Sequence, residues 1–312
     1  MKLVGMLLAL TFGLTVLATG GWLPAGAVFA LNLALSVSLI FLFGRLPLGA
    51  SLGWTFILTA ASGWMGKSWM AAVVYLALTL LPAAAVGLAV AKKISYGRTL
   101  LVLAASALAP TALFVGFAYS SVQLQLLAFG ETMKQTLAGL GAGLGSSARG
   151  EQFQKAVQSY LEFIVGVIPA LYFISSFFFL ALSHLLAVWA LGRLGIFSPG
   201  PKKFITWQAP FFLVFLLGAG LASHLFLEAG WVAAADNLLV VVIFIYAVGG
   251  ASNVEYFLKK LRAHWAVKGL FYVWMVLFGL ASFFILSAVG FLDSRFDFRG
   301  LKKVALTKES EE

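Results

Sequence analysis

The chain has 312 residues, of which 62% are hydrophobic and only 10% are charged. This composition, with a mean hydropathy of +1.01, excludes an ordinary water-soluble domain and a disordered chain. The formal net charge of +10 does not indicate a nucleic-acid partner, because the basic residues flank apolar runs and form no continuous stripe. The absence of cysteine excludes disulfides, thiolate metal sites and a thiol nucleophile.

Apolar runs long enough to cross a bilayer follow one another along the chain. They predict an all-α, polytopic membrane protein with about nine transmembrane helices, eight being the alternative. A short apolar start after Lys2 resembles a signal peptide, but its length favours a retained first span. The expected spans are residues 3–19, 25–43, 47–65, 69–91, 99–119, 161–192, 207–227, 235–252 and 268–291.

Residues 120–160 form the longest expected segment outside the membrane. Apolar side chains recur every three or four residues from Leu126 to Leu140, which predicts an amphipathic helix on the outer membrane surface. The glycine-rich stretch 139–147 predicts a hinge after it. The expected organisation is a helical bundle at 1–119, this insertion at 120–160, a second bundle at 161–291 and a charged tail at 292–312.

Every second connection between the expected spans is basic. This alternation predicts a cytoplasmic amino terminus, with the basic connections on the same side. The tail does not fit this scheme. Nine spans would place it outside, whereas Arg295, Arg299 and Lys302 favour the cytoplasm and eight spans.

Polar residues in two places are candidates for binding a solute. The first set surrounds the connection between the expected spans 207–227 and 235–252, where carboxylates and an imidazole could hold a polar or cationic solute or a proton; an ordinary solvated loop is the alternative. The second set lies inside the spans, together with Ser175, Ser176 and Ser183, and could line a polar pathway or bond one helix to another. The candidate binding residues are His224, Glu228, Asp236, Asn237, Glu162, His184 and Asn32.

Sequence motifs for catalysis are missing. The chain contains no His-Glu-x-x-His zinc motif, no Gly-x-Ser-x-Gly elbow and no Walker phosphate loop. We therefore expect a protein that is not an enzyme and that has no metal and no cofactor.

The carboxyl-terminal third resembles the YybS-like family of predicted bacterial multi-pass membrane proteins, a family of unknown function. The resemblance rests on Trp207 to Pro210, on Asn237 to Val240 and on the ending Gly290 to Arg299. It implies a bacterial inner membrane and a distant similarity to the S components of energy-coupling-factor transporters. The positions that it singles out, without a known role, are Trp207, Pro210, Asn237, Gly290, Asp293, Asp297 and Arg299.

The ending has a charge pattern of its own. Asp293 and Asp297 are one helical turn apart, and so are Arg295 and Arg299. This spacing predicts an interfacial helix that anchors the chain while its phenylalanines enter the headgroup region.

Two functions are compatible with these patterns. The first is capture or transport of a small solute, because the expected helices are broken by Gly and Pro and carry polar groups. The alternative is a scaffolding subunit that binds partner membrane proteins through faces of small residues such as Gly49 and Gly53. The expected partners are accordingly the lipid bilayer, a small polar or cationic solute, and membrane-protein subunits.

Overall fold

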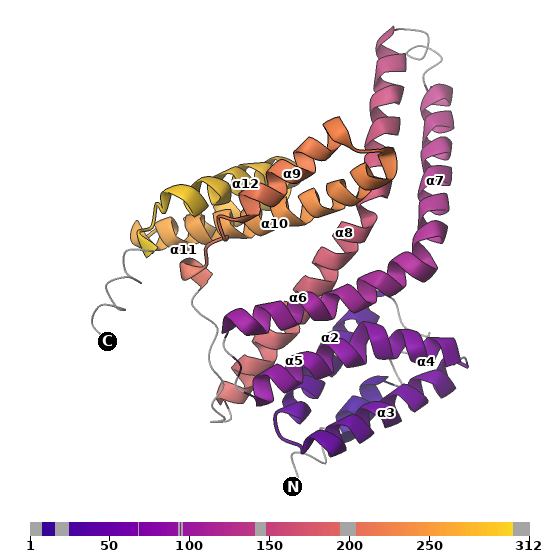
Figure 1. Cartoon of the computed structure of the whole chain (residues 1–312), viewed down its shortest axis with the longest axis vertical. Helices are drawn as coiled ribbons and strands as arrows, with labels where there is room; N and C mark the ends of the chain where they lie inside the picture. Colours follow the sequence, from indigo (N-terminus) through magenta and orange to yellow (C-terminus); the bar gives the residue numbers. More distant parts are fainter. Residues whose placement is uncertain are drawn as a thin grey trace. The chain divides into compact units, whose positions relative to one another are not determined.

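A computed structural model describes residues 8–15, 25–67, 69–92, 94, 96–140, 148–193 and 204–301. These residues form helices and connecting turns and contain no strand, so the predicted all-α fold is confirmed (Figure 1). Contacts divide the chain into unit 1, residues 1–125 and 172–201, and unit 2, residues 126–171 and 202–312. The boundaries expected at 119/120, 160/161 and 291/292 fall inside helices, and that division stays a prediction.

Unit 1 is a bundle of apolar helices. After a helical stretch at residues 8–15, the chain forms three continuous helical segments, 25–43, 48–65 and 69–91, at nearly the bounds predicted for three spans. Pro47 precedes the second of them, where the missing N–H of proline is tolerated. The helices of unit 1 are α2 (Ala25–Phe43), α3 (Leu48–Met65), α4 (Trp69–Tyr75), α5 (Leu81–Ala91), α6 (Tyr96–Leu113), the start of α7 (Tyr119–Leu140) and the end of α8 (Ala148–Arg193).

Two π-helical turns interrupt this bundle. The turn η1 (Leu76–Leu80) joins α4 to α5, and η2 (Phe114–Ala118) joins α6 to α7, each without a break. In η1 the N–H of Leu81 donates to the carbonyl of Leu76, five residues back. Pro82 follows and has no N–H to continue the normal ladder, which accounts for the wider turn at this point.

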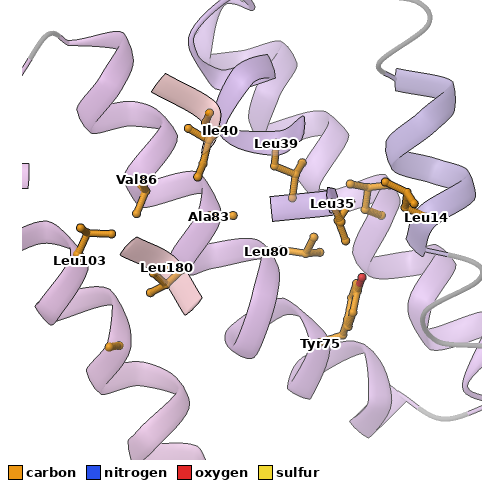
Figure 2. Close-up of a cluster of buried hydrophobic side chains, with 13 residues drawn as sticks. Leu14, Leu35, Leu39, Ile40, Tyr75, Leu80, Ala83, Val86, Leu103 and Leu180 are labelled. Carbon is orange, nitrogen blue, oxygen red and sulfur yellow. The ribbon is translucent and has the colours of Figure 1, made fainter. Parts of the chain in front are cut away.

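Leucine, alanine and valine side chains fill the core of unit 1, as Figure 2 shows. Leu35 and Leu39 of α2 meet Leu80 and Val86 of the η1–α5 segment there, and all four are almost completely buried. A Cβ added to Gly87 would lie 2.6 Å from the Cβ of Phe43. Gly87 therefore permits α5 to lie directly against α2.

Unit 2 is built around two long helices that run in the same direction. Its elements after the first part of α8 are η3 (Phe204–Thr206), α9 (Leu213–Phe226), α10 (Ala229–Lys260), α11 (Trp265–Leu277) and α12 (Gly279–Phe296). Ser287 of α12 donates to the carbonyl of Ile243 in α10, and one turn later Gly290 lies against the backbone of Tyr246. A later residue of α12 thus contacts a later residue of α10, so the two helices run side by side in the same direction.

The predicted number of nine spans is not confirmed. Among the described residues, four helices are long and apolar enough to cross a membrane. Shorter apolar helices lie at Ala27–Phe43, Leu81–Ala91 and Leu213–Phe226. The long ones are Arg98–Thr132, Lys155–Arg193, Trp231–Lys260 and Gly279–Phe296.

Two predicted elements differ from the structure. No break occurs at residues 119–120, where the sequence predicts a separate surface helix, because η2 continues α6 directly into α7. The span expected at 268–291 is divided at Phe278 into α11 and α12. Of the predicted hinge, residues 139–140 still belong to α7, and 141–147 lie outside the described residues.

Candidate functional site

A pocket of about 440 Å³ lies within unit 1. Four segments that are far apart in the sequence line it: α2, η1, α6 and the unit 1 part of α8. Each contributes residues from the middle of an apolar run, so the pocket lies among segments whose composition suits the bilayer interior. The lining residues are Val28, Phe29, Asn32, Thr79, Pro110, Tyr172, Ser175, Ser176, Phe179 and Leu180.

Irregular helix geometry brings the polar lining residues to this place. Thr79 belongs to the π-turn η1, and Pro110 stands inside α6 one turn before the π-turn η2. A proline in a helix removes one backbone hydrogen bond, and a π-turn shifts the following side chains around the axis. Such interruptions of apolar helices are typical of binding sites in membrane proteins.

Aromatic rings border the pocket in two pairs. Phe29 of α2 meets Phe179 of α8 edge to face, with ring centroids 5.6 Å apart. Tyr172 stacks on Phe114 of η2 at 4.3 Å. These pairs hold the rings in defined orientations.

Two of the predicted binding residues belong to unit 1, and only Asn32 lines the pocket. Its amide oxygen is buried and has no hydrogen-bond partner in the described part of the chain. His184 is buried one turn beyond Leu180 of α8, and its Nδ1 has no partner among the described residues. The sequence singles out Ser175 and Ser176, but it gives no sign that Thr79, Tyr172 or Pro110 would join them.

The outer cluster predicted from the sequence forms in part. His224 of α9 and Asp236 of α10 approach to 2.8 Å between Nε2 and Oδ1, with side chains 46% and 23% exposed. Glu228 stands at the start of α10 without a side-chain capping bond, and it is exposed. A pair with this exposure contributes little to stability and lies open to solvent or headgroups.

The side chain of Asn237 makes hydrogen bonds to the backbone of α8, and its predicted role in binding a solute stays a prediction. Its amide nitrogen donates to the carbonyl of Gly166 at 2.7 Å, and its amide oxygen accepts from the N–H of Ala170 at 2.8 Å. Gly166 and Ala170 are the two groups that an unbroken α8 would join to each other. Pro169 interrupts α8 here, so the side chain of Asn237 bridges the interrupted ladder and ties α10 to α8 within unit 2.

Glu162 stands in the unit 2 part of α8 and is exposed. It accepts a hydrogen bond from Gln158 of the same helix at 3.0 Å. His224, Glu228, Asp236 and Glu162 are not among the lining residues of the pocket in unit 1, and their role as binding residues stays a prediction.

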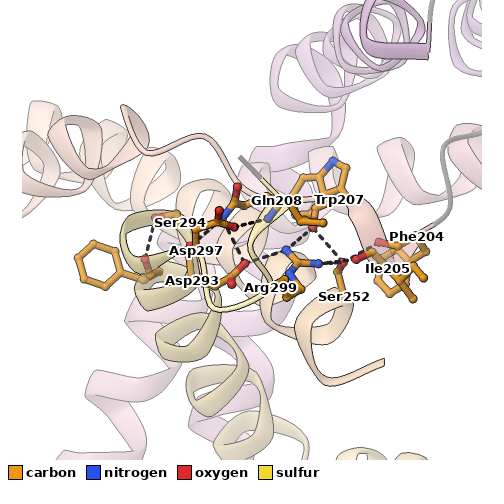
Figure 3. A network of polar contacts seen from close by, with 11 residues as sticks. Phe204, Ile205, Trp207, Gln208, Ser252, Asp293, Ser294, Asp297 and Arg299 are labelled. Atoms are coloured by element: carbon orange, nitrogen blue, oxygen red, sulfur yellow. Dashed lines mark hydrogen bonds and ion pairs between the residues drawn. The ribbon is translucent and has the colours of Figure 1, made fainter. Parts of the chain in front are cut away.

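Two of the residues singled out at the carboxyl end, Asp293 and Arg299, belong to a buried polar cluster, which Figure 3 shows. Nη2 of Arg299 lies 2.7 Å from Oδ2 of Asp293. The same guanidinium donates to the carbonyls of Ile205 and Trp207 and to the hydroxyl of Ser252. One arginine thus ties together the segment before α9, the end of α10 and the end of α12.

The backbone of Asp297 makes this cluster possible. Asp297 has a φ of 48° and caps α12 in the left-handed conformation, which aspartate tolerates better than most residues. The chain turns back there and carries Arg299 into the protein. The interfacial anchor predicted for this ending is therefore wrong for Asp293 and Arg299, which are buried, whereas Phe296 and Phe298 are exposed and stack on each other.

Two members of this cluster are not found by sequence reasoning. Gln208 donates to the backbone carbonyl of Asp293 at 2.7 Å, and Ser252 donates to the carbonyl of Phe204. Of the positions singled out, Trp207 contributes its carbonyl, Gly290 permits close packing, and Pro210 is exposed beside the cluster. For Gln208, the sequence offers one signal, because it follows Trp207 at the start of the expected span 207–227.

Within the described ranges, no group of three or more His, Cys, Asp or Glu residues could hold a metal ion.

The model of one protein family, described as predicted membrane protein DUF2232, matches residues 23–294. The chain belongs to this family. Asp297 and Arg299 lie beyond the matched residues. No curated protein and no solved structure matches the chain. Membership establishes a membrane protein of a family without an assigned activity.

Proposed function

We propose that this member of the DUF2232 family captures or transports a small solute, which it holds in the pocket between α2, η1, α6 and α8. The pocket itself carries the proposal, because an amide and four hydroxyl side chains line it within apolar helices. Polar groups at such depth are costly and are mostly found where they serve a function. The resemblance to transporter S components agrees with this proposal as an analogy.

The proposal includes an inner-membrane location with the amino terminus in the cytoplasm. The alternation of basic connections along the sequence supports the cytoplasmic amino terminus. Within unit 2, positive charge gathers at one end, where Lys259 and Lys260 end α10 and Arg295 lies near the end of α12. Basic residues at membrane boundaries favour the cytoplasmic side. On this assignment His224 and Asp236, at the far end of α9 and α10, face outward.

A scaffolding role is the second candidate, and one observation favours it. Gly49 and Gly53 lie on α3 with no atom of the described chain within 4 Å of an added Cβ. Leu52 and Phe56 of the same helix are 50% and 75% exposed. A small-residue face bordered by apolar side chains can receive another helix closely.

One purification separates the two functions. The protein is isolated in mild detergent, and the proteins and small molecules that remain bound are identified by mass spectrometry. Ser176→Phe should fill the pocket, and Leu182→Phe, on the same helix but outside the lining, is the matched control. A solute retained by wild type and by the control but lost from Ser176→Phe supports capture or transport.

Other outcomes of this purification assign the function elsewhere. A solute lost only from the double variant Glu228→Gln, Asp236→Asn would move the site to the outer cluster. A stoichiometric membrane protein that is lost from Gly49→Leu, with no retained solute, would assign the scaffolding role and contradict the pocket.

A further inference from the structure

The pocket of unit 1 contains no charged side chain in its lining. The described basic residues of this unit stand at helix ends, as Arg45, Lys92 and Arg193 do. An ion placed in the pocket would lose its hydration without gaining a counter-charge. This loss costs several kcal/mol at least, so the lining selects against a solute with a permanent charge.

The same lining favours a ring. Phe29, Tyr172 and Phe179 contribute three aromatic side chains from two helices. The partners Phe114 and Phe179 fix the orientations of Tyr172 and Phe29 at centroid distances of 4.3 and 5.6 Å. Rings that are already oriented bind another flat ring by stacking or by edge-to-face contact with little loss of side-chain freedom.

Two polar side chains of the lining, Asn32 and Ser175, offer hydrogen-bond acceptors. The oxygen of Asn32 is buried without a partner among the described residues. The hydroxyl of Ser175 donates its hydrogen to the carbonyl of Tyr172 at 2.9 Å, which leaves its oxygen free to accept. An unsatisfied buried acceptor costs about 1–3 kcal/mol. A ligand that donates to Asn32, after a small rotation of the amide, removes this cost.

We infer that the solute is an uncharged, flat ring compound that carries at least one N–H or O–H donor. This inference rests on the proposed function and narrows it. It also departs from the cationic solute that the sequence allows, since the acidic residues behind that expectation do not line the pocket.

Four probes of nearly equal shape test the inference. Benzamide is neutral with N–H donors, N,N-dimethylbenzamide is neutral without a donor, benzamidine is a cation and benzoate is an anion. Each is added at millimolar concentration to the full chain in lipid nanodiscs, and binding is measured by saturation-transfer NMR and by the shift of the melting temperature. We expect benzamide to bind more tightly than each of the other three by about tenfold, the effect of one hydrogen bond or more.

Matched variants assign the binding to the pocket. Asn32→Leu and, independently, Ser175→Ala should weaken benzamide binding, and Ser176→Phe should abolish it. Leu182→Phe and the double variant Glu228→Gln, Asp236→Asn should leave it unchanged. Ser175 is exposed and lines the pocket, so Ser175→Ala should still fold. It tests the inference even if Asn32→Leu does not fold.

The remaining outcomes separate this inference from the proposed function. Binding of benzamidine, benzoate or N,N-dimethylbenzamide at least as tight as that of benzamide, and abolished by Ser176→Phe, would overturn the inference and leave the pocket as a solute site. Binding of no probe, or equal binding to wild type and Ser176→Phe, would overturn the inference. The proposed function would fail as well if the purified wild type retained no solute that Ser176→Phe loses.

Discussion

Nη2 of Arg299 lies 2.7 Å from Oδ2 of Asp293, and neither side chain is more than 1% exposed. Four further hydrogen bonds surround this pair, from the guanidinium to Ile205, Trp207 and Ser252 and from Gln208 to Asp293. A buried charge is stabilised by its charged partner and by hydrogen bonds, and removal of the partner is strongly destabilising. The pair therefore makes the folding of unit 2 depend on residues close to the end of the chain.

Breaking this pair from either side should destabilise unit 2. Asp293→Asn or Arg299→Met leaves one buried charge without its partner, which costs about 3–5 kcal/mol. The double variant should be less destabilised than the sum of the two, because no lone charge remains. Thermal unfolding in detergent measures the effect, with the exposed Arg295→Met as the control. Equal stability of Arg299→Met and Arg295→Met would contradict the pairing.

Gly290→Ala should weaken the contact between α10 and α12. A Cβ at this position would overlap the carbonyl oxygen of Tyr246, and backbone atoms cannot move aside as a side chain can. Overpacking of this kind costs about 1–3 kcal/mol or more. Gly218→Ala in α9 is the control, because nothing lies within 4 Å of its added Cβ. Unfolding midpoints of the two variants, measured under the same conditions, should differ; equal midpoints would refute the close approach.

Asn237→Ala should loosen α8 where Pro169 interrupts it. The change removes both bonds to Gly166 and Ala170, and a backbone group that is buried and left without a partner costs about 1–3 kcal/mol. Hydrogen exchange should become faster in α8 around residue 170. The neighbouring Asp236→Asn breaks only a half-exposed pair, so its effect should stay below about 1 kcal/mol. A larger effect of Asp236→Asn than of Asn237→Ala would reverse this assignment.

Apolar runs predict the helices of this protein well where polar or Pro and Gly residues separate them. The spans expected at 25–43 and 69–91 coincide with α2 and with the continuous segment from α4 to α5. The division at Phe278 is missed because the sequence is apolar on both sides of it. The pocket partners of Asn32 could not be predicted either, because π-turns at Thr79 and after Pro110 decide which side of each helix faces inward.

The tail should lie on the same side of the membrane as the end of α10. The helices α10 and α12 run in the same direction, and Arg299 bonds Ser252 near the end of α10. The connection at Leu227 lies at the opposite end, where α9 passes into α10. Because the chain has no cysteine, single cysteines can be placed at exposed positions without background and labelled in intact cells with a maleimide that does not cross membranes.

Leu227→Cys should react in intact cells, whereas Lys260→Cys and Phe298→Cys should react only after the membrane is permeabilised, because basic residues favour the cytoplasm. Two comparisons between these variants depend on the structure alone and not on the charge rule. Positions 260 and 298 must react alike, and position 227 must differ from both. If Phe298→Cys reacted in intact cells as Leu227→Cys does, α12 would cross the membrane in the opposite direction to α10. Such a result would also restore the tail to the outside, as nine spans require.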